Sequence, residues 1–295
     1  MTAFALVTVI HDSAAELERL LDSVAERLEP APRIVVVDSG SRDEGAELAR
    51  RRGAEVLSLR GNLGFGAGCN AGLGPVREPV TALVNPDVEL LDAGMAELVR
   101  EAGGRDALLA PRLLNEDGTV QDSAHPPPGT LDSFVPALLP RPLLPSPLRR
   151  RYEPWRSDSP RAVGWALGAC LVARTEVLRR LGPFDASAFL FYEDMDLCLR
   201  AADAGVPTLL RPGVAIRHRG GASTRPALGT ADLELRARRR RDVIRQRGRA
   251  ALALDDAAQA ATFAMRAVGR GILRRGGSRE RAQLQALLAA RRPAR

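Results

Sequence analysis

The stretch Arg33-Ile34-Val35-Val36-Val37-Asp38-Ser39-Gly40-Ser41 joins a β-branched apolar run to an abrupt polar end. A run of this composition is typical of a strand that is buried on both faces of a sheet. Two similar apolar runs flank it in the sequence, at residues 4–10 and 55–59. We therefore predict three strands in this region, each leading into a polar or glycine-rich loop.

The segments that separate these strands, residues 14–27 and 44–52, are predicted to be helices. In the first of them, Leu17, Leu20 and Leu21 recur at helical spacing. Strands that alternate with helices, through connections too long for hairpins, indicate a parallel sheet covered by helices. Because ligands of such sheets bind outside the carboxyl ends of the strands, the loops that follow the strands are where a site is expected.

The composition limits the kind of protein that this chain can be. Its 295 residues are 45% hydrophobic, which is enough for a sizeable folded core. No run of about 18 apolar residues occurs, so we expect no transmembrane helix. Residues 1–10 have the pattern of a first strand and not of a signal peptide. The three cysteines lack metal-type spacing, and we predict buried free thiols in a reducing cytoplasm.

The charge of the chain is concentrated at its C-terminal end. The net charge is +7, and residues 236–295 hold 17 Arg against 4 acidic residues, a net of 17 − 4 = +13. The first 235 residues therefore carry 7 − 13 = −6. We predict helices with arginine faces from residue 233 onward. Such faces suit an anionic membrane surface, with a solvated face as the alternative. Nucleic acid is not favoured, because Phe263 is the one aromatic residue of this tail.

Residues 126–160 hold 10 of the 21 prolines of the chain. We expect this segment to be an irregular surface excursion beside the site, and not regular core. Regular structure is predicted to resume over residues 162–174, followed by a helix at 175–181 and a second helix at 194–204.

Two loops at predicted strand ends carry groups that suit a nucleotide. The Asp38 carboxylate can accept hydrogen bonds from a ribose or a base, and a turn that caps the next helix is an equally good explanation. The glycine-dense loop at residues 60–70 opens a helix, where backbone N–H groups favour a phosphate. Its spacing matches neither common phosphate-binding fingerprint, so a tight turn between strand and helix explains it as well.

A rigid acidic turn follows the predicted strand at residues 81–84. The turn reads Asn85-Pro86-Asp87, and its proline fixes the backbone and removes a donor. The Asp87 carboxylate suits a hard divalent cation that is bound jointly with a diphosphate. An ordinary turn aspartate is the alternative.

A second acidic group, Glu193 and Asp194, comes directly after the aromatic run at residues 189–192. Aromatic neighbours desolvate a carboxylate and raise its pKa toward that of a general base. Stabilisation of acids at a helix N-terminus is the structural alternative. His218 ends another apolar run beside a glycine pair, where it suits either a metal ligand or a structural role.

Together these segments resemble the large family of inverting glycosyltransferases with the GT-A fold, and within it the bacterial rhamnosyltransferase-like branch. The resemblance covers about residues 4–225, and its pieces come in the order of the family. These pieces are residues 35–41, 62–70, 85–87, 164–169, 182–185 and 191–197, and His218.

The resemblance implies an α/β fold with a Rossmann-like, mostly parallel sheet flanked by helices. The glycosyltransferase domain would span residues 1–225, and a basic helical extension would span 226–295. It also implies a nucleotide-sugar donor, with dTDP-L-rhamnose as the leading candidate. The acceptor would be a cell-envelope glycan or a polyprenyl-diphosphate-linked sugar, met in the cytoplasm or at the inner face of the membrane.

Roles for single residues follow from the same resemblance. Asp194 would be the catalytic base that deprotonates the acceptor hydroxyl, and Glu193 would help to position the acceptor. Asp87 and His218 would hold Mg²⁺ or Mn²⁺ against the donor diphosphate. The residues implied to bind the donor nucleotide are Asp38, Arg60, Asn62, Gly64, Phe65, Asn70 and Asn85. Those implied on the acceptor side are Trp165, Gly168 and Asp185.

Two motifs depart from the family, and three alternatives stay open. The D-x-D motif has only one acid here, Asp87, with Asn85 at its first position, as is common in the rhamnosyltransferase-like branch. After the first strand the branch has Asn-Tyr-Asn, whereas this chain has Ile10-His11-Asp12. The donor could be a UDP-hexose or UDP-galactofuranose. A nucleotidyltransferase would need a glycine-rich and basic loop after the first strand, which this sequence lacks. A non-catalytic GT-A-like protein that binds nucleotide sugars would not depend on Asp194 for its action.

Overall fold

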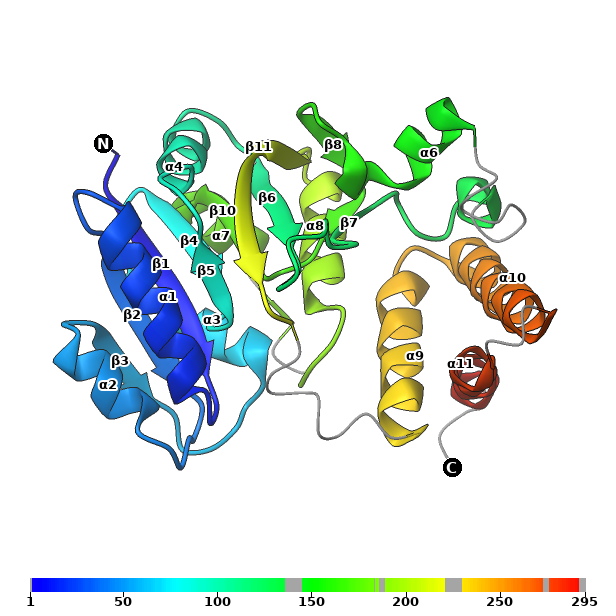
Figure 1. The fold of residues 1–295 in the computed structure, drawn as a ribbon, viewed down its shortest axis with the longest axis horizontal. Coiled ribbons are helices and arrows are strands. Elements are labelled where there is room, and N and C mark those ends of the chain that lie inside the picture. Colours follow the sequence, from blue (N-terminus) through cyan, green and yellow to red (C-terminus); the bar gives the residue numbers. More distant parts are fainter. Residues whose placement is uncertain are drawn as a thin grey trace. The chain divides into compact units, whose positions relative to one another are not determined.

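The computed structural model describes residues 2–135, 145–182, 184–185, 189–220, 230–272 and 276–291 (Figure 1). By its internal contacts the chain divides into two compact units. Unit 1 comprises Met1–His125 and Trp155–Ser223, and unit 2 comprises Pro126–Pro154 and Thr224–Arg295.

Unit 1 contains the central sheet. Its strands, in chain order, are β1 (Phe4–Ile10), β2 (Arg33–Asp38), β3 (Glu55–Ser58), β4 (Val80–Val84), β5 (Val88–Leu90), β6 (Leu108–Leu114), β8 (Arg161–Val163), β10 (Cys170–Arg174) and β11 (Thr208–His218). A separate pair is formed by β7 (Ala124–His125) and β9 (Trp165–Ala166). The helices of unit 1 are α1 (Ala14–Arg27), α2 (Gly45–Arg51), α3 (Phe65–Leu73), α4 (Met95–Gly103), α7 (Thr175–Leu181) and α8 (Glu193–Asp203).

The strand order is β3-β2-β1-β4-β10-β6-β11-β5, with β8 also paired to β11. The first four strands are parallel, as predicted from their sequences. The strand β10 runs antiparallel to both β4 and β6, so β6 and its parallel neighbour β11 point the same way as β4. The strands β5 and β8 are antiparallel to β11. A mostly parallel sheet flanked by helices is therefore confirmed, with three reversed strands (Figure 1).

Hydrophobic side chains of the buried strands pack on both faces of the sheet. Phe4 and Leu6 of β1 belong to the cluster that also contains Leu20 of α1. Val7 and Val9 point the other way, toward α3, since successive side chains of a strand face opposite sides. Full burial of a leucine such as Leu6 stabilises the fold by about 1.5–3 kcal/mol.

The expectation of a wholly irregular excursion at residues 126–160 is wrong in part. Residues 136–144 lie outside the described residues, but a helix, α6 (Ser146–Tyr152), follows them. Its prolines, Pro145 and Pro147, stand at the helix start, where the missing N–H donor costs nothing. Short 3-10 turns are present at Leu131–Phe134 and Pro154–Arg156. Trp155 is buried against Ala124 and Leu210 of unit 1.

Unit 2 ends in the predicted helical extension, formed by α9 (Thr230–Arg245), α10 (Arg249–Ile272) and α11 (Ser278–Ala290). Part of its basic run is structural. Arg240 pairs with the buried Asp255 at 2.7 Å, and the buried Arg241 pairs with Asp256. No described helix has the length and apolar character to span a bilayer.

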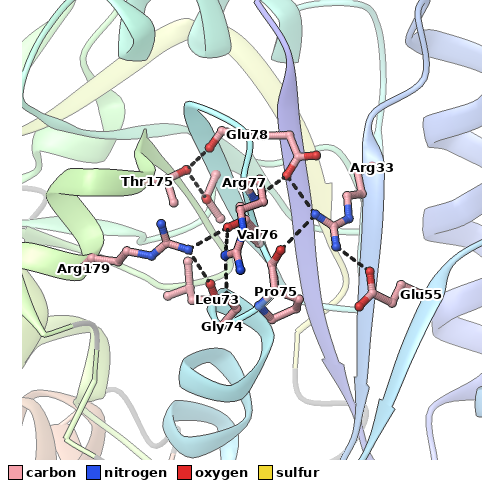
Figure 2. Close-up of polar contacts among 11 residues, drawn as sticks. Arg33, Glu55, Leu73, Gly74, Pro75, Val76, Arg77, Glu78, Thr175 and Arg179 are labelled. Atoms are coloured by element: carbon pink, nitrogen blue, oxygen red, sulfur yellow. Dashed lines mark hydrogen bonds and ion pairs between the residues drawn. The ribbon is translucent and has the colours of Figure 1, made fainter.

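Arginines close the edge of the sheet where the parallel strands begin (Figure 2). Arg33 of β2 donates to the Pro75 carbonyl at 3.0 Å and to the Glu55 carboxylate at 2.6 Å. Arg179 of α7 donates to the carbonyls of Leu73 and Val76, at 3.1 and 2.7 Å. These carbonyls lie at or just beyond the C-terminus of α3, where a helix leaves acceptors without internal partners.

A buried hydroxyl joins the same edge to the reversed strand. Thr175, directly after β10, donates its hydroxyl to the Glu78 carbonyl at 2.6 Å. The same oxygen lies 2.8 Å from the hydroxyl of Thr81 in β4. Every polar group named at this edge therefore has a partner within the protein.

Candidate active site

The turn after β4 and the end of β11 lie side by side. The turn Asn85-Pro86-Asp87 leads into β5, and the pairing of Val88 with His218 sets β5 against β11. Asp87 Oδ1 is therefore 3.3 Å from His218 Nε2, and both side chains are about nine-tenths buried. The backbone N–H of Arg219 also donates to the Asp87 carbonyl, at 3.1 Å.

Asn85 extends this group toward the next loop. Its backbone N–H donates to the Ala169 carbonyl at 2.9 Å, and its Nδ2 lies 3.5 Å from His218 Nε2. Its Oδ1 is buried and has no hydrogen-bond partner among the described residues. A buried oxygen of this kind needs a partner, and a cation or a ligand donor would supply one.

These residues fit a divalent ion that is shared with a ligand. A carboxylate and an imidazole are ordinary ligands of such ions. No group of three or more His, Cys, Asp or Glu residues within the described ranges could hold a metal by itself. Asp87 and His218 would therefore hold the ion together with oxygens from outside the protein, such as those of a diphosphate.

Asp194 stands in the first turn of α8 and is held by two backbone donors. Its Oδ2 accepts from the Gly168 N–H at 2.9 Å, and its Oδ1 accepts from the Met195 N–H at 2.7 Å. Burial raises the pKa of this carboxyl, although both hydrogen bonds act in the opposite direction. The predicted direction of the shift is thus confirmed for Asp194, and a raised pKa suits a general base.

Two strained residues bring the chain into α8. Phe191 and Tyr192 have φ angles of 77° and 63°, in the left-handed region that residues other than glycine seldom adopt. Such backbone costs on the order of 1–3 kcal/mol per residue and gathers at functional sites. Trp165, predicted on the acceptor side, packs edge-on against Tyr192 and stacks on His125, with ring centroids 6.3 and 4.2 Å away.

Two consecutive residues, Gly168 and Ala169, link Asp194 to the turn at Asn85, and we call them the strip. Gly168 donates its N–H to Asp194, and the next carbonyl, that of Ala169, accepts from Asn85. A Cβ added to Gly168 would lie 3.2 Å from the Asp194 Cβ, so the contact is close. The structure thereby brings the predicted base and the predicted metal turn to one edge of the sheet.

The residues at the ends of β1 and β2 hold each other in place. Asp38 Oδ1 accepts from the Ser41 N–H at 2.8 Å, so a turn is present at Asp38. This turn does not cap the next helix, because α2 begins at Gly45 and the side chain of its N-cap residue makes no capping hydrogen bond. His11 Nδ1 lies 3.0 Å from the Ser39 carbonyl, and Asp12 Oδ1 accepts from the Arg42 N–H at 2.6 Å. All of these groups lie at the strand ends where a nucleotide is expected.

The glycines of the loop at residues 60–70 serve close packing. Gly64 has φ +85°, and a Cβ added there would lie 2.0 Å from the Phe189 carbonyl oxygen. Gly68, within α3, would meet the Val9 side chain at 2.6 Å. The tight turn between strand and helix is therefore observed. Arg60 and Asn62 remain exposed before the helix, and the Asn62 side chain accepts from the Gly64 N–H at 3.0 Å.

Phe65 and Asn70 fasten α3 to the segment that contains Phe184. Phe65 meets the Phe184 ring edge-on at 5.8 Å, and Asn70 exchanges two hydrogen bonds with the Phe184 backbone, of 2.9 and 3.1 Å. Asp185 follows as an exposed residue. The neighbouring Pro183 of the predicted motif lies outside the described residues.

Sequence reasoning missed one neighbour of His218. Gln121 lies on the chain after β6, and its Oε1 is 2.8 Å from His218 Nδ1. No motif marked this residue, because neither β6 nor the turn that follows it was predicted. The predicted free thiols are confirmed, since Cys69, Cys170 and Cys198 are all buried and unbridged.

Known proteins share this fold and parts of this sequence. The N-acetylglucosaminyl-diphospho-decaprenol L-rhamnosyltransferase of Mycobacterium tuberculosis is 29% identical, over 74% of this chain and 76% of its own. The mannosyltransferase PcManGT of Pyrobaculum calidifontis, solved with GDP-Man and Mn²⁺, has a TM-score of 0.59 at 16% identity, covering 97% of this chain and 85% of its own. GalNAc-T7, solved with UDP, GalNAc and Mn²⁺, has a TM-score of 0.57 at 17% identity, covering 81% of this chain and 47% of its own.

The two structural neighbours establish a GT-A fold of the kind that the strand order and the site already indicate. The sequence match is more specific. Residues 5–157, more than half of the chain, match the model of glycosyl transferase family 2, and the chain therefore belongs to that family of glycosyltransferases.

Proposed function

We propose that the protein transfers a sugar from a nucleotide-sugar donor to an acceptor hydroxyl with inversion at the anomeric carbon. The observation that carries this proposal is the strip Gly168–Ala169, which joins Asp194 on one side to the Asn85 turn on the other. An in-line displacement needs a base on one face of the sugar and charge neutralisation on the other. One donor molecule lying across the strip would meet both.

In this mechanism Asp194 takes the proton of the acceptor hydroxyl. The acceptor oxygen forms a bond to the anomeric carbon, and the bond from that carbon to the diphosphate oxygen breaks. The nucleoside diphosphate leaves with the electron pair. Burial keeps the Asp194 pKa raised, so its carboxylate is a stronger base than an exposed one.

The remaining residues bind and orient. Asp87 and His218 would hold Mg²⁺ or Mn²⁺, which when bound supplies positive charge to the departing diphosphate. Asp38, Arg60 and Asn62 would face the nucleotide. Glu193, Trp165 and Asp185 would lie toward the acceptor. All of these residues lie within residues 1–225, the proposed glycosyltransferase domain.

We propose an activated L-rhamnose, dTDP-L-rhamnose, as the donor and a polyprenyl-diphosphate-linked sugar or cell-envelope glycan as the acceptor. The supporting observation is the 29% identity to a protein named as an L-rhamnosyltransferase that acts on a decaprenol-linked sugar. A UDP-hexose or UDP-galactofuranose is the competing donor.

The test is a donor panel with a short-chain polyprenyl-diphosphate-linked N-acetylglucosamine as acceptor. Nucleoside diphosphate release should be greatest with dTDP-L-rhamnose, should need Mn²⁺ or Mg²⁺ and should stop in EDTA. NMR of the product should show the anomeric configuration opposite to that of the donor. Full turnover in EDTA would overturn the metal assignment, and retention of configuration would overturn the role of Asp194.

We also propose that unit 2 attaches the enzyme to the cytoplasmic face of an anionic membrane. Met265, Val268 and Ile272 recur on one face of α10 and are 47%, 58% and 77% exposed. Arg266 and Arg270 are exposed on the same helix, and the predicted residues Leu273, Arg274 and Arg275 lie outside the described residues. The full chain should float with vesicles that contain phosphatidylserine, and Val268→Glu/Ile272→Glu should abolish this. Unchanged flotation of the variant would rule the helix out.

A further inference from the structure

The His218 ring is held on two sides. Its Nε2 faces Asp87 Oδ1 at 3.3 Å, the position proposed for the metal ion. Its Nδ1 faces Gln121 Oε1 at 2.8 Å. A neutral imidazole carries its proton on one nitrogen and a lone pair on the other, so the partner of Nδ1 decides what Nε2 can offer to a cation.

A chain of side chains fixes which atom of Gln121 faces His218. Gln121 Nε2 donates to Asn115 Oδ1 at 3.1 Å, and Asn115 Nδ2 donates to Thr119 Oγ1 at 2.9 Å. The Thr119 hydroxyl in turn donates to Asp117 Oδ1 at 2.6 Å. An ionised carboxylate only accepts, so the direction of each hydrogen bond in the chain follows from Asp117. The Gln121 oxygen is left to face His218.

The backbone around Gln121 keeps this chain in place. The turn at residues 115–119 is closed by two hydrogen bonds, from Asn115 N–H to the Thr119 carbonyl at 2.8 Å and from Gly118 N–H to the Asn115 carbonyl at 3.0 Å. The Gln121 N–H donates to the Leu113 carbonyl of β6 at 2.8 Å. Because β6 lies beside β11, Gln121 and His218 are positioned by neighbouring strands of one sheet.

We infer that Gln121 is a positioning residue of the metal site, which holds His218 with its proton on Nδ1 and its Nε2 lone pair turned toward Asp87. Two acceptors, the Nε2 lone pair and a carboxylate oxygen, then lie 3.3 Å apart, and a cation that both of them coordinate would satisfy both. Partners that orient a metal-binding histidine in this way contribute about 10- to 100-fold to metal affinity. The inference rests on the metal site of the proposed function.

The first test reads the tautomer directly in the wild-type protein. The chain has three histidines, so their ring signals can be assigned by substituting each in turn. Long-range ¹H–¹⁵N NMR of the full chain, labelled with ¹⁵N-histidine and recorded at mildly alkaline pH, should show the His218 proton on Nδ1. A proton on Nε2 would overturn the inference without any variant.

The second test measures Mn²⁺ affinity by the electron paramagnetic resonance of free Mn²⁺, with dTDP and with UDP in separate titrations. Gln121→Met keeps the length of the side chain but removes the acceptor, and it should weaken Mn²⁺ binding about 10- to 100-fold. Gln121→Glu restores an acceptor and should bind Mn²⁺ close to wild type. Gln246→Met, at an exposed glutamine of unit 2, is the matched control and should change nothing.

Two failures can be told apart. If His218→Ala loses Mn²⁺ while Gln121→Met binds it as the wild type does, the inference about Gln121 is wrong and the metal site stands. If His218→Ala itself binds Mn²⁺ like the wild type, the proposed metal site is wrong.

Discussion

At the edge where β2 and β4 begin, arginines and a buried threonine donate to the backbone carbonyls of Pro75, Glu78 and Leu73, as Figure 2 shows. At the opposite edge, where the same strands end, the Asn85 Oδ1 atom is buried without a partner among the described residues. Asp194 at that edge is partly buried, and desolvation raises its pKa. Both edges belong to one sheet. The difference is what we expect if the first edge serves stability and the groups at the second edge take ligands as partners, as proposed above.

The comparison predicts its largest effect for Asp194→Asn, which should lower turnover about 10²- to 10⁴-fold, the usual contribution of a general base. Folding should change little. The variant loses one acceptor for the Gly168 or Met195 N–H, but it also removes a partly desolvated charge. The rate of nucleoside diphosphate release measures the effect on turnover, and calorimetric melting measures the effect on folding. Unchanged turnover would favour a protein that binds nucleotide sugars without acting on them.

The pH profile sharpens the same prediction. Asp194 must be ionised to act as the base, and its pKa lies above the ordinary carboxyl value of 3.8. As the pH is lowered, wild-type turnover should therefore begin to fall at a higher pH than it would with an exposed aspartate as the base. The free energy of unfolding depends on pH in the opposite direction. A raised folded-state pKa contributes stability at low pH that is lost as the pH rises through it, so Asp194→Asn should gain relative to wild type with rising pH.

A smaller effect is expected at two glycines with similar positive φ angles. Gly64 has φ +85° and no room for a Cβ, whereas Gly53 has φ +78° and nothing within 4 Å of an added Cβ. Gly53→Ala should cost only the left-handed conformation, roughly 1–2 kcal/mol of the free energy of unfolding. Gly64→Ala adds a clash with the Phe189 carbonyl and should cost about 1–3 kcal/mol more.

Urea unfolding of both variants measures this difference. The site should also respond, because the loop that holds Gly64 lies at the ligand edge, and the KM for the donor should rise in Gly64→Ala alone. Equal losses of stability in the two variants would show that the contact with Phe189 is not important.

The smallest effect on turnover is expected at the closed edge, where Thr175→Val removes a buried hydroxyl. The Glu78 carbonyl and the Thr81 hydroxyl would then lack a partner, which costs about 1–3 kcal/mol of the free energy of unfolding. The turnover number of the folded protein should stay at the wild-type value. Thr130→Val, which removes a solvent-exposed hydrogen bond to the Pro127 carbonyl, serves as the control, with a change within about 0.5 kcal/mol. A turnover loss as large as that of Asp194→Asn would remove the distinction between the edges.

The sequence predicted the first four strands because their runs are rich in apolar and β-branched residues and contain no proline. The alternation of the first three with helices predicted that they are parallel. The sequence did not predict β6, nor the full length of β11, since Pro111 and Pro212 break the two runs and prolines argue against central strands. The structure explains their presence by an irregularity in the register, where the pairing shifts between Arg211 and Ala215 of β11. Prolines are tolerated at such bulges.

The same limit applies to the site. The turn at Asp87 was visible as a rigid acid after a strand, but its contact with His218 depends on β5 pairing with β11, which no local pattern encodes. Only the family resemblance joined the two residues. Gln121 was invisible for the same reason, because its contact with His218 arises between two strands that are far apart in the sequence.

The reversed strand β10 has a consequence for how substrate preference can change. In a sheet whose strands all run in one direction, each strand ends at the ligand edge, so only segments that leave the sheet lie there. The reversed strand β10 begins at that edge, so a segment that enters the sheet lies there as well. This incoming segment supplies the Gly168 N–H and the Ala169 carbonyl. The incoming segment borders Asp194, and the outgoing segment after β4 carries Asp87. With the roles proposed for these two residues, mutations in the incoming segment would alter the choice of acceptor while the outgoing segment preserved the leaving-group chemistry, so the two properties could evolve separately.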